Sequence, residues 1–163
     1  MEFLKLRDGH QIPCMGYGCY NAFGEEMSRG IISAVERGYR YIDSAAKYGN
    51  EPAVGEGIAS CGVAREELFV LSKAWPASYE NVEAAAMQTM KDLKVEYLDA
   101  YLLHWPGTDE TRRLKAYEQL LRLQEKEICR IGAVSNFQID QLQVLEKEFG
   151  AFPVINEMEL HPT

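Results

Sequence analysis

The sequence lacks the features that mark membrane, secreted and nucleic-acid-binding proteins. It contains no run of roughly 18 apolar residues, so we expect no transmembrane helix. The opening MEFLKLRDGHQIP lacks the basic and then apolar layout of a signal peptide. Positive charge is scarce, because 17 Lys and Arg stand against 25 Asp and Glu and give a formal net charge of −8. This balance argues against nucleic acid or an anionic membrane surface as the main partner.

Cysteine and histidine are too few and too scattered for a disulfide framework or a zinc site. The four cysteines form no Cys-X-X-Cys pair, and the three histidines lie far apart without the spacing of metal ligands. We therefore expect reduced thiols in a cytoplasmic protein, and no metal site. The cysteines are Cys14, Cys19, Cys61 and Cys129.

The sequence also lacks a low-complexity linker, while its hydrophobic content is high enough for a core. Hydrophobic residues make up 47% of the 163 positions, which predicts a single globular domain over residues 1–163. Short apolar runs alternate with stretches of helical periodicity, and this alternation is typical of parallel βαβ units. We expect strands at CMGYG (14–18), YRYID (39–43), LFVLSK (68–73), LDAYLLH (98–104), RIGAVS (130–135) and PVINEMEL (153–160).

Helices are expected between these strands. The clearest covers residues 79–93, with Ser78 as its N-cap, and segments 114–126 and 138–149 show the same period. The opening FLKLRDGHQIP has a different pattern, that of a short hairpin turning at Asp8-Gly9.

A Gly-X-Gly-X-X-Gly motif, which follows the first strand of a doubly wound dinucleotide-binding sheet, is absent. The segment GYGCYNAFG (16–24) has glycines at the wrong spacing, and no clear helix start follows them. We therefore predict the other parallel α/β architecture, a (β/α)8 barrel of the TIM type, with about six of its eight βα units in this chain.

Polar side chains stand at the carboxyl ends of successive expected strands. Any one of them alone is more simply a solvated loop residue, a packed core histidine or a helix cap. In a barrel, however, these strand ends converge on one face, where active sites are built. Their joint occurrence therefore favours a site, and its candidate members are Asp43, Lys73, His104, Ser135, Asn136, Asn156 and Glu157.

Five segments resemble, in order, the aldo-keto reductase family, in the branch of diketogluconate reductase and prostaglandin F synthase. The opening LKLRDGHQIPCMGYGCY extends the resemblance over essentially the whole chain. It implies an enzyme, a cytoplasmic reductase of aldehydes or ketones that takes its hydride from NADPH. The five segments are DSAAKYGNE (43–51), LSKAW (71–75), LDAYLLHWP (98–106), IGAVSNF (131–137) and INEMELHP (155–162).

Four residues match those that carry the chemistry in that family, namely Asp43, Tyr48, Lys73 and His104. The resemblance implies that Tyr48 donates the proton to the carbonyl oxygen. A free tyrosine has a pKa near ~10 and donates poorly at neutral pH, so the role implied for the Lys73 ammonium is to lower that pKa. Asp43 would hold Lys73 in place, and His104 would orient the substrate oxygen.

Cofactor contacts are also implied by the resemblance. Ser135, Asn136 and Glu157 match the residues that hold the nicotinamide carboxamide, and Asp43 is counted with them. Glu157 departs from the usual glutamine. A carboxylate accepts hydrogen bonds but donates none unless it is protonated, so we expect cofactor binding that is weakened or reoriented.

The remaining implied contacts line the cleft. Gly18, Cys19 and Tyr20 match the first-strand segment beside cofactor and substrate, with Cys19 in place of a commoner threonine. Trp75 and Trp105 are expected either to form an apolar substrate wall, together with Tyr20, Tyr48 and His104, or simply to pack. His161 is expected to be structural. The polar segment PGTDETRR (106–113) favours compact, hydrophilic carbonyls such as keto-sugars or methylglyoxal-like aldehydes.

The sequence stops at Thr163, just after the sixth expected strand, whereas a complete barrel has about 250 residues. We expect unpaired edges on the first and sixth strands, which are open to self-association. Three explanations stay open. The chain is a truncated reductase, which we favour; it associates with another chain that supplies the missing units; or it is a catalytically incompetent barrel that acts as a binding or regulatory protein.

Overall fold

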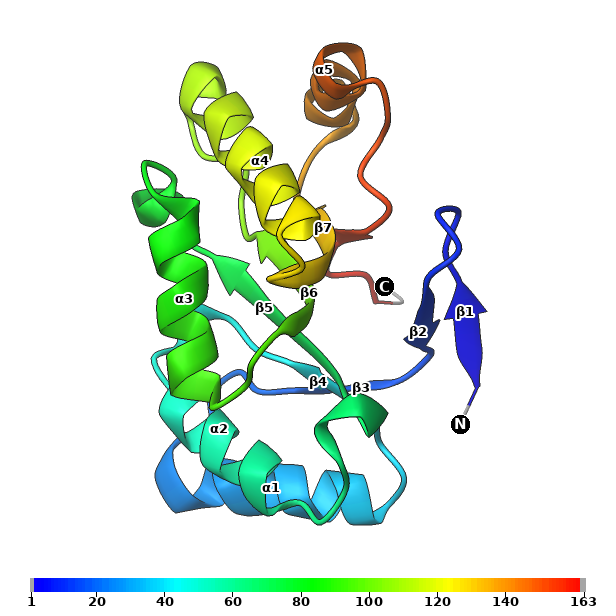
Figure 1. The fold of residues 1–163 in the computed structure, drawn as a ribbon, viewed down its shortest axis with the longest axis vertical. Helices are drawn as coiled ribbons and strands as arrows, with labels where there is room; N and C mark the ends of the chain where they lie inside the picture. Colours follow the sequence, from blue (N-terminus) through cyan, green and yellow to red (C-terminus); the bar gives the residue numbers. More distant parts are fainter. Residues whose placement is uncertain (1, 162–163) are drawn as a thin grey trace.

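A six-stranded parallel sheet organises the computed structural model, which describes residues 2–161 (Figure 1). The strands lie side by side in their order along the chain, and every neighbouring pair is parallel. A doubly wound sheet would reverse its strand order, so the predicted barrel architecture is confirmed. The strands are β3 (Gly16–Gly18), β4 (Tyr41–Asp43), β5 (Phe69–Ala74), β6 (Leu98–Leu103), β7 (Cys129–Ser135) and β8 (Asn156–Glu157).

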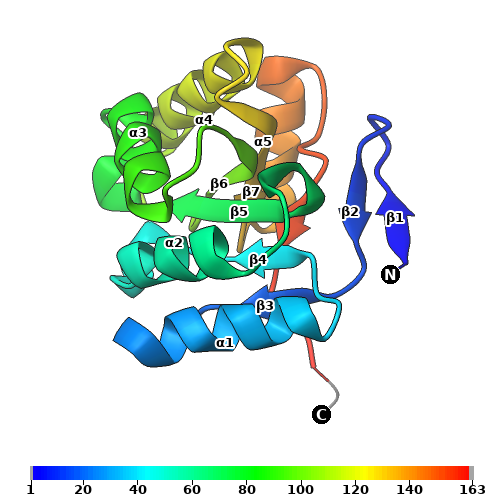
Figure 2. The same ribbon diagram turned by 60° about the horizontal axis from the view of Figure 1, so that its bottom comes forward.

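Helices cover the outer face of the curled sheet (Figures 1 and 2). Each strand from β3 to β7 is followed by a helix before the next strand begins. None of the helices in the described part of the chain is long and apolar enough to cross a membrane. The helices are α1 (Gly24–Glu36), α2 (Glu51–Ser60), α3 (Val82–Leu93), α4 (Glu110–Glu125) and α5 (Ile139–Phe149).

The hydrophobic residues of the strands divide between two core layers. On β5, Val70 packs in the large cluster between sheet and helices, while Leu71 packs in a smaller cluster on the inner face. On β6, Tyr101 and Leu102 divide in the same way. This follows from the two-residue period of a strand, which points successive side chains to opposite faces. The inner cluster consists of Phe69, Leu71, Ala100, Leu102, Ile131 and Ala133.

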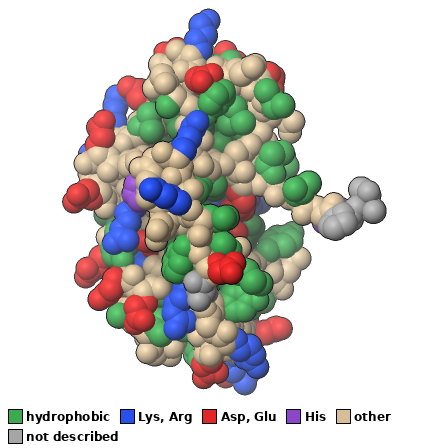
Figure 3. All heavy atoms as spheres, turned by 90° about the vertical axis from the view of Figure 1, so that its right-hand side faces the viewer, with side chains coloured by type: hydrophobic (Ala, Val, Ile, Leu, Met, Phe, Trp, Pro, Cys, Tyr) green, Lys and Arg blue, Asp and Glu red, His purple; other side chains and the backbone are tan. Residues whose placement is uncertain are grey.

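A hairpin at the start of the chain packs against this inner cluster. Strands β1 (Phe3–Lys5) and β2 (Gln11–Pro13) pair antiparallel, and Gly9 takes φ +97° in the turn. The predicted hairpin is therefore confirmed. Leu6 and Ile12 lie against the inner cluster. Figure 3 views the molecule from this side and shows hydrophobic side chains interspersed with charged ones across the face.

Two helices, α1 and α2, were not among the segments singled out in the sequence. The residue before α1 is Phe23, whose side chain cannot cap the helix, so the usual polar N-cap residue is missing. Helix α2 contains glycines at its tightest contacts. A Cβ on Gly55 would lie 2.3 Å from the backbone oxygen of Asp92, and one on Gly57 would lie 2.9 Å from Ile31 Cβ. Close packing on two neighbours, rather than an amphipathic pattern, accounts for this helix.

Two smaller predictions were wrong. The cap of α3 is Asn81, whose side chain accepts a hydrogen bond from the Ala84 N–H at 2.9 Å, whereas Ser78 ends a 3-10 turn, η3 (Pro76–Ser78). The expected strand 153–160 is reduced to the two residues of β8, because only β7 pairs with it among residues 2–161. Pro162, the last residue of the INEMELHP segment, lies outside the described residues.

Candidate active site

The polar residues expected at the strand ends share the inner face of the sheet. Asp43 follows the inner-facing Tyr41 by two residues, Lys73 follows Leu71, and His104 follows Leu102. Because side chains alternate along a strand, each is the next inward position beyond the apolar core. Ser135 follows Ala133 in the same way, and Glu157 is in register with Ser135. The strand period therefore places all five at one end of the half-barrel interior.

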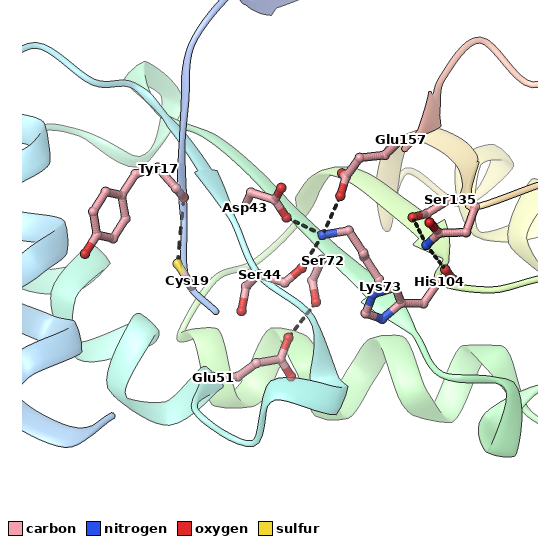
Figure 4. Close-up of polar contacts among 11 residues, drawn as sticks. Tyr17, Cys19, Asp43, Ser44, Glu51, Ser72, Lys73, His104, Ser135 and Glu157 are labelled. Carbon is pink, nitrogen blue, oxygen red and sulfur yellow. Dashed lines mark hydrogen bonds and ion pairs between the residues drawn. The ribbon is translucent and has the colours of Figure 1, made fainter. Parts of the chain in front are cut away.

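Lys73 stands at the centre of this group, and its side chain is fully buried. Its ammonium contacts an oxygen of Asp43, donates to the backbone oxygen of Ser44 at 3.1 Å, and lies 3.1 Å from Glu157 Oε1 (Figure 4). Burial alone would lower the pKa of Lys73, but the two carboxylates outweigh it and raise the pKa above its usual value. Lys73 is therefore a cation held between two anions. We call Asp43, Lys73 and Glu157 the Lys73 cluster.

The contact between Lys73 and Glu157 shows how far the sheet curls. Two strands separate β5 from β8, so a flat sheet would place them about 14 Å apart. The Asn156 side chain holds the β8 backbone, because it accepts from the Phe137 N–H at 3.2 Å and donates to the Phe137 oxygen at 2.9 Å. The sequence predicted a cofactor contact for Glu157 but not this ion pair, since the pair depends on curvature.

Glu157 keeps one oxygen free. Its Oε2 is buried and has no hydrogen-bond partner within residues 2–161. Burial raises the pKa of the Glu157 carboxyl and Lys73 opposes that rise. A buried acceptor without a partner is costly unless a ligand or water meets it. Glu157 Oε2 is therefore available to an incoming N–H group.

Tyr48 ends a 3-10 turn, η1 (Ala46–Tyr48), just after β4. Its half-buried ring has its centroid 5.6 Å from Lys73 Nζ and 5.7 Å from the His104 ring centroid. Lys73 acts to lower the Tyr48 pKa, as expected, but the pKa is raised overall. Burial raises the pKa, and Lys73 opposes but does not reverse the rise. Burial is the largest cause of the rise, and the Asp43 and Glu157 carboxylates add to it.

His104 is held by its backbone and by aromatic neighbours. Its N–H donates to the Ala74 oxygen and its own oxygen accepts from Asn136 Nδ2, both at 3.0 Å. The Trp75 ring packs edge-on at 5.3 Å between centroids. Burial, together with Lys73, lowers the pKa of His104 to about 4, so the ring is neutral at pH 7. Its Nδ1 is buried without a partner in the described part of the chain.

A cleft of about 610 Å³ opens beside these groups. Asn136, at φ +63°, donates to Ser135 Oγ at 2.9 Å as well as to His104. Cys19 lies apart from the cleft, since its side chain is fully buried in the core between sheet and helices. Gly18 does not line it either. The lining residues are Tyr20, Lys47, Tyr48, Trp75, His104, Trp105, Ser135, Asn136, Glu157, Met158 and Glu159.

A second charged cluster lies at the opposite, amino ends of the strands. The buried Asp99 carboxylate is bound by Arg65 at 2.7 Å and by Arg130 at 3.1 Å, and it also accepts from the Val70 N–H at 2.9 Å. The Tyr97 ring lies under both guanidinium groups, at 4.1 and 4.4 Å. We call Arg65, Asp99 and Arg130 the Asp99 cluster. Its residues were not singled out in the sequence, because no strand-end pattern marks them.

These features define a class of protein. Parallel strands in chain order, helices on the outer face and a polar cleft at the carboxyl ends of the strands are the architecture of a (β/α)8 barrel with its site at the usual end. Within residues 2–161, no group of three or more His, Cys, Asp or Glu side chains is arranged to hold a metal ion.

The family model described as "Aldo/keto reductase family" matches residues 16–163, and the chain belongs to this family. It is 40% identical over 159 residues to methylglyoxal reductase DkgA of Escherichia coli K12 and 42% identical over 165 residues to glyoxal reductase of Bacillus subtilis. These alignments cover 98% and 99% of this chain but 58% and 59% of the relatives, so the chain spans less than two thirds of their length.

Solved structures agree with this assignment. An aldo/keto reductase from Brucella melitensis superposes with a TM-score of 0.95 at 37% identity, over 99% of this chain and 64% of that protein. An aldo-keto reductase from Bombyx mori in complex with NADP superposes with a TM-score of 0.91 at 32% identity, over 99% of this chain and 59% of that protein.

Proposed function

We propose that this chain carries the proton-transfer site of a carbonyl reductase that uses NADPH and acts on small aldehydes or ketones. One observation carries the proposal. A buried Lys73 ammonium, paired with Asp43, lies beside the Tyr48 ring and near a neutral His104, at the edge of an open cleft. This arrangement provides an acid, a cation to stabilise its conjugate base, and a second polar group to orient an oxygen.

Tyr48 is the proposed proton donor. A phenol is protonated at neutral pH, so the acid is in its donating form when a carbonyl arrives. Because its pKa is raised in this structure, proton transfer depends on stabilisation of the phenolate. As the proton leaves, the phenolate gains stabilisation from the Lys73 ammonium, and Asp43 holds Lys73 in position. The proton moves from the Tyr48 hydroxyl to the carbonyl oxygen, and an alcohol results.

His104 is proposed to orient the carbonyl. A neutral imidazole has one N–H donor, which can reach the carbonyl oxygen without competing as an acid with Tyr48. Its backbone is fixed through Ala74 and Asn136, and its ring is packed against Trp75, so little ordering remains to be done when substrate binds.

NADPH, when bound, supplies the hydride to the carbonyl carbon. The residues present fit a nicotinamide carboxamide, because the partnerless Glu157 Oε2 can accept from its NH₂ group and the Asn136 amide stands at the same end of the cleft. The Bombyx mori relative was solved with NADP. The choice of NADPH over NADH is part of this proposal and rests on the resemblance.

Small dicarbonyls are the proposed substrates. The relatives from Escherichia coli and Bacillus subtilis are named for methylglyoxal and glyoxal. In this chain the connection after β6 is short, since α4 begins at Glu110 with Asp109 as its N-cap. Trp75 and Trp105 line the cleft beside this connection.

A cofactor titration followed by turnover tests the proposal. Both tryptophans of the chain line the cleft, so NADPH binding should quench their fluorescence. The expected result is saturable quenching, followed by methylglyoxal-dependent loss of NADPH absorbance. Tyr48→Phe should keep the quenching and lose the turnover. Quenching without turnover in the unsubstituted chain would favour the alternative of a binding or regulatory barrel. No quenching by a folded chain would overturn the cofactor assignment.

A further inference from the structure

The Lys73 cluster carries one more negative charge than a simple ion pair. A single buried ammonium meets Asp43 from β4 and Glu157 from β8, so the cluster has a net charge of −1 when both acids are ionised. Because the contacts come from two separate strands, removing one carboxylate leaves the other in place. The two contributions can therefore be separated by substitution.

Tyr48 lies close enough to the Lys73 cluster for the charges of the cluster to affect ionisation of its hydroxyl. Its ring lies 5.6 Å from the Lys73 ammonium, and Asp43 and Glu157 both oppose ionisation of its hydroxyl. The other titratable groups around the cluster and Tyr48 include Tyr41 on β4 and His104 after β6 on the inner face, with Cys19 and Glu51 behind the sheet. Tyr20, whose ring centroid lies 5.1 Å from that of Tyr48, and Lys47 line the same cleft.

We propose that Glu157 is a positioning residue that tunes the proton donor. By pairing with Lys73 it offsets part of the ammonium's charge and makes the Tyr48 hydroxyl harder to ionise. A glutamine at this position would keep an acceptor oxygen beside Lys73 but remove the charge. The cluster would then be neutral, and a phenolate at Tyr48 would face an ammonium balanced by Asp43 alone. The inference rests on the proposed function only in taking Tyr48 as the proton donor.

Glu157 is better suited to this role than its acidic neighbour in the same segment. Glu159 also lines the cleft, but its carboxylate pairs with His161 at 3.3 Å and its side chain is 86% exposed. Water screens such a charge, whereas Glu157 is partly buried and in direct contact with Lys73. Glu159→Gln therefore removes the same formal charge two residues away without touching the cluster, and it is the matched control.

The experiment is a pH titration of Tyr48 without cofactor or substrate. Tyrosine labelled with carbon-13 at the ring carbon that bears the hydroxyl reports ionisation by NMR, and Tyr48→Phe identifies the Tyr48 signal. Glu157→Gln should move the midpoint of this signal to lower pH than in the unsubstituted chain. Glu159→Gln should leave it unchanged.

The outcomes decide the inference. A Tyr48 midpoint that Glu157→Gln leaves in place or moves to higher pH would overturn it, as would an equal downward shift from Glu159→Gln. Glu157→Ala is the second variant if Glu157→Gln does not fold, because the β7–β8 contacts at this position are made by the backbone. The measurement needs no turnover, so failure of the proposed reductase activity and failure of this inference give different results.

Discussion

The two charged clusters at opposite ends of the sheet are similar in composition and opposite in sign. The Lys73 cluster has one buried cation between two carboxylates, and the Asp99 cluster has one buried carboxylate between two guanidinium groups. They differ in how completely their carboxylate oxygens are satisfied. Both oxygens of Asp99 are bound, while Glu157 Oε2, at the other end, has no partner within residues 2–161.

This difference separates a structural cluster from a site. The Asp99 cluster joins β5, β6 and β7 through a carboxylate that also accepts a backbone N–H, and neither oxygen of that carboxylate is left for a ligand. Within residues 2–161, Arg65 Nε is the one side-chain atom of this cluster that is buried without a partner. The Lys73 cluster borders a cleft and retains unmet hydrogen-bonding capacity. A buried acceptor without a partner costs stability, and the free Glu157 oxygen lies at a cleft where another molecule can meet it.

The largest expected effect is on turnover. Tyr48→Phe removes only the hydroxyl from a ring that keeps its contacts with Tyr20 and His104. Loss of a general acid should lower the rate of carbonyl reduction by about a hundredfold to ten-thousandfold. The measurement is steady-state reduction of methylglyoxal, with NADPH quenching as the control for binding. A rate within a few-fold of the unsubstituted chain would show that Tyr48 is not the donor.

The second largest expected effect is on stability and comes from a substitution in the Asp99 cluster. Asp99→Asn removes the charge between two guanidinium groups and should lower the free energy of unfolding by about 3 kcal/mol. Lys73→Met should cost less, because the two carboxylates it leaves can bind a proton, whereas the guanidinium groups left by Asp99→Asn cannot lose one. Urea unfolding of both variants at pH 7 measures the difference. A larger loss for Lys73→Met would contradict the assignment of the Asp99 cluster as the structural one.

His104, at the carboxyl ends of the strands, should make the free energy of unfolding depend on pH. The folded-state pKa of His104 is lowered to about 4, below the usual 6.5, so the unfolded chain binds a proton that the folded chain does not. His104 therefore costs stability as pH falls from 6.5 toward 4, by about 2 kcal/mol. His104→Gln should flatten this part of the urea-unfolding profile. An unchanged slope would show that the imidazole is not buried in its neutral form.

The smallest expected effect is the loss of stability when Arg130 of the Asp99 cluster is removed, and it is compared with the loss for Arg65. Arg130 is 52% exposed and Arg65 is 18% exposed. Arg130→Ala should lower the free energy of unfolding by less than about 1 kcal/mol, as for other solvated ion pairs. Arg65→Ala should cost more, because Arg65 also donates to the backbone oxygens of Leu68 and Tyr97. Equal losses in urea unfolding would show that exposure does not rank the two arginines.

Much of the architecture was readable from local patterns. The six strands and three of the helices lie where apolar runs and helical periods predicted them, with shifts at their ends and a much shortened β8. Helices α1 and α2 were not predicted from the sequence. Neither has a side-chain N-cap hydrogen bond, and α2 packs through glycines rather than larger side chains. The Asp99 cluster was not predicted either, because its contacts join residues about 30 positions apart in the sequence.

The sequence by itself determined that polar side chains meet at one end of the strands. The two-residue period of the strands places Asp43, Lys73 and His104 one step beyond the apolar inner residues, and no tertiary contact is needed to see this. Only the tertiary structure decided which charges meet. The curl of the sheet brings Glu157 of β8 to Lys73 of β5, and burial beside those charges sets the direction of the Tyr48 pKa. Alternation is a local property of the backbone, whereas curvature and burial arise only when the whole sheet has formed.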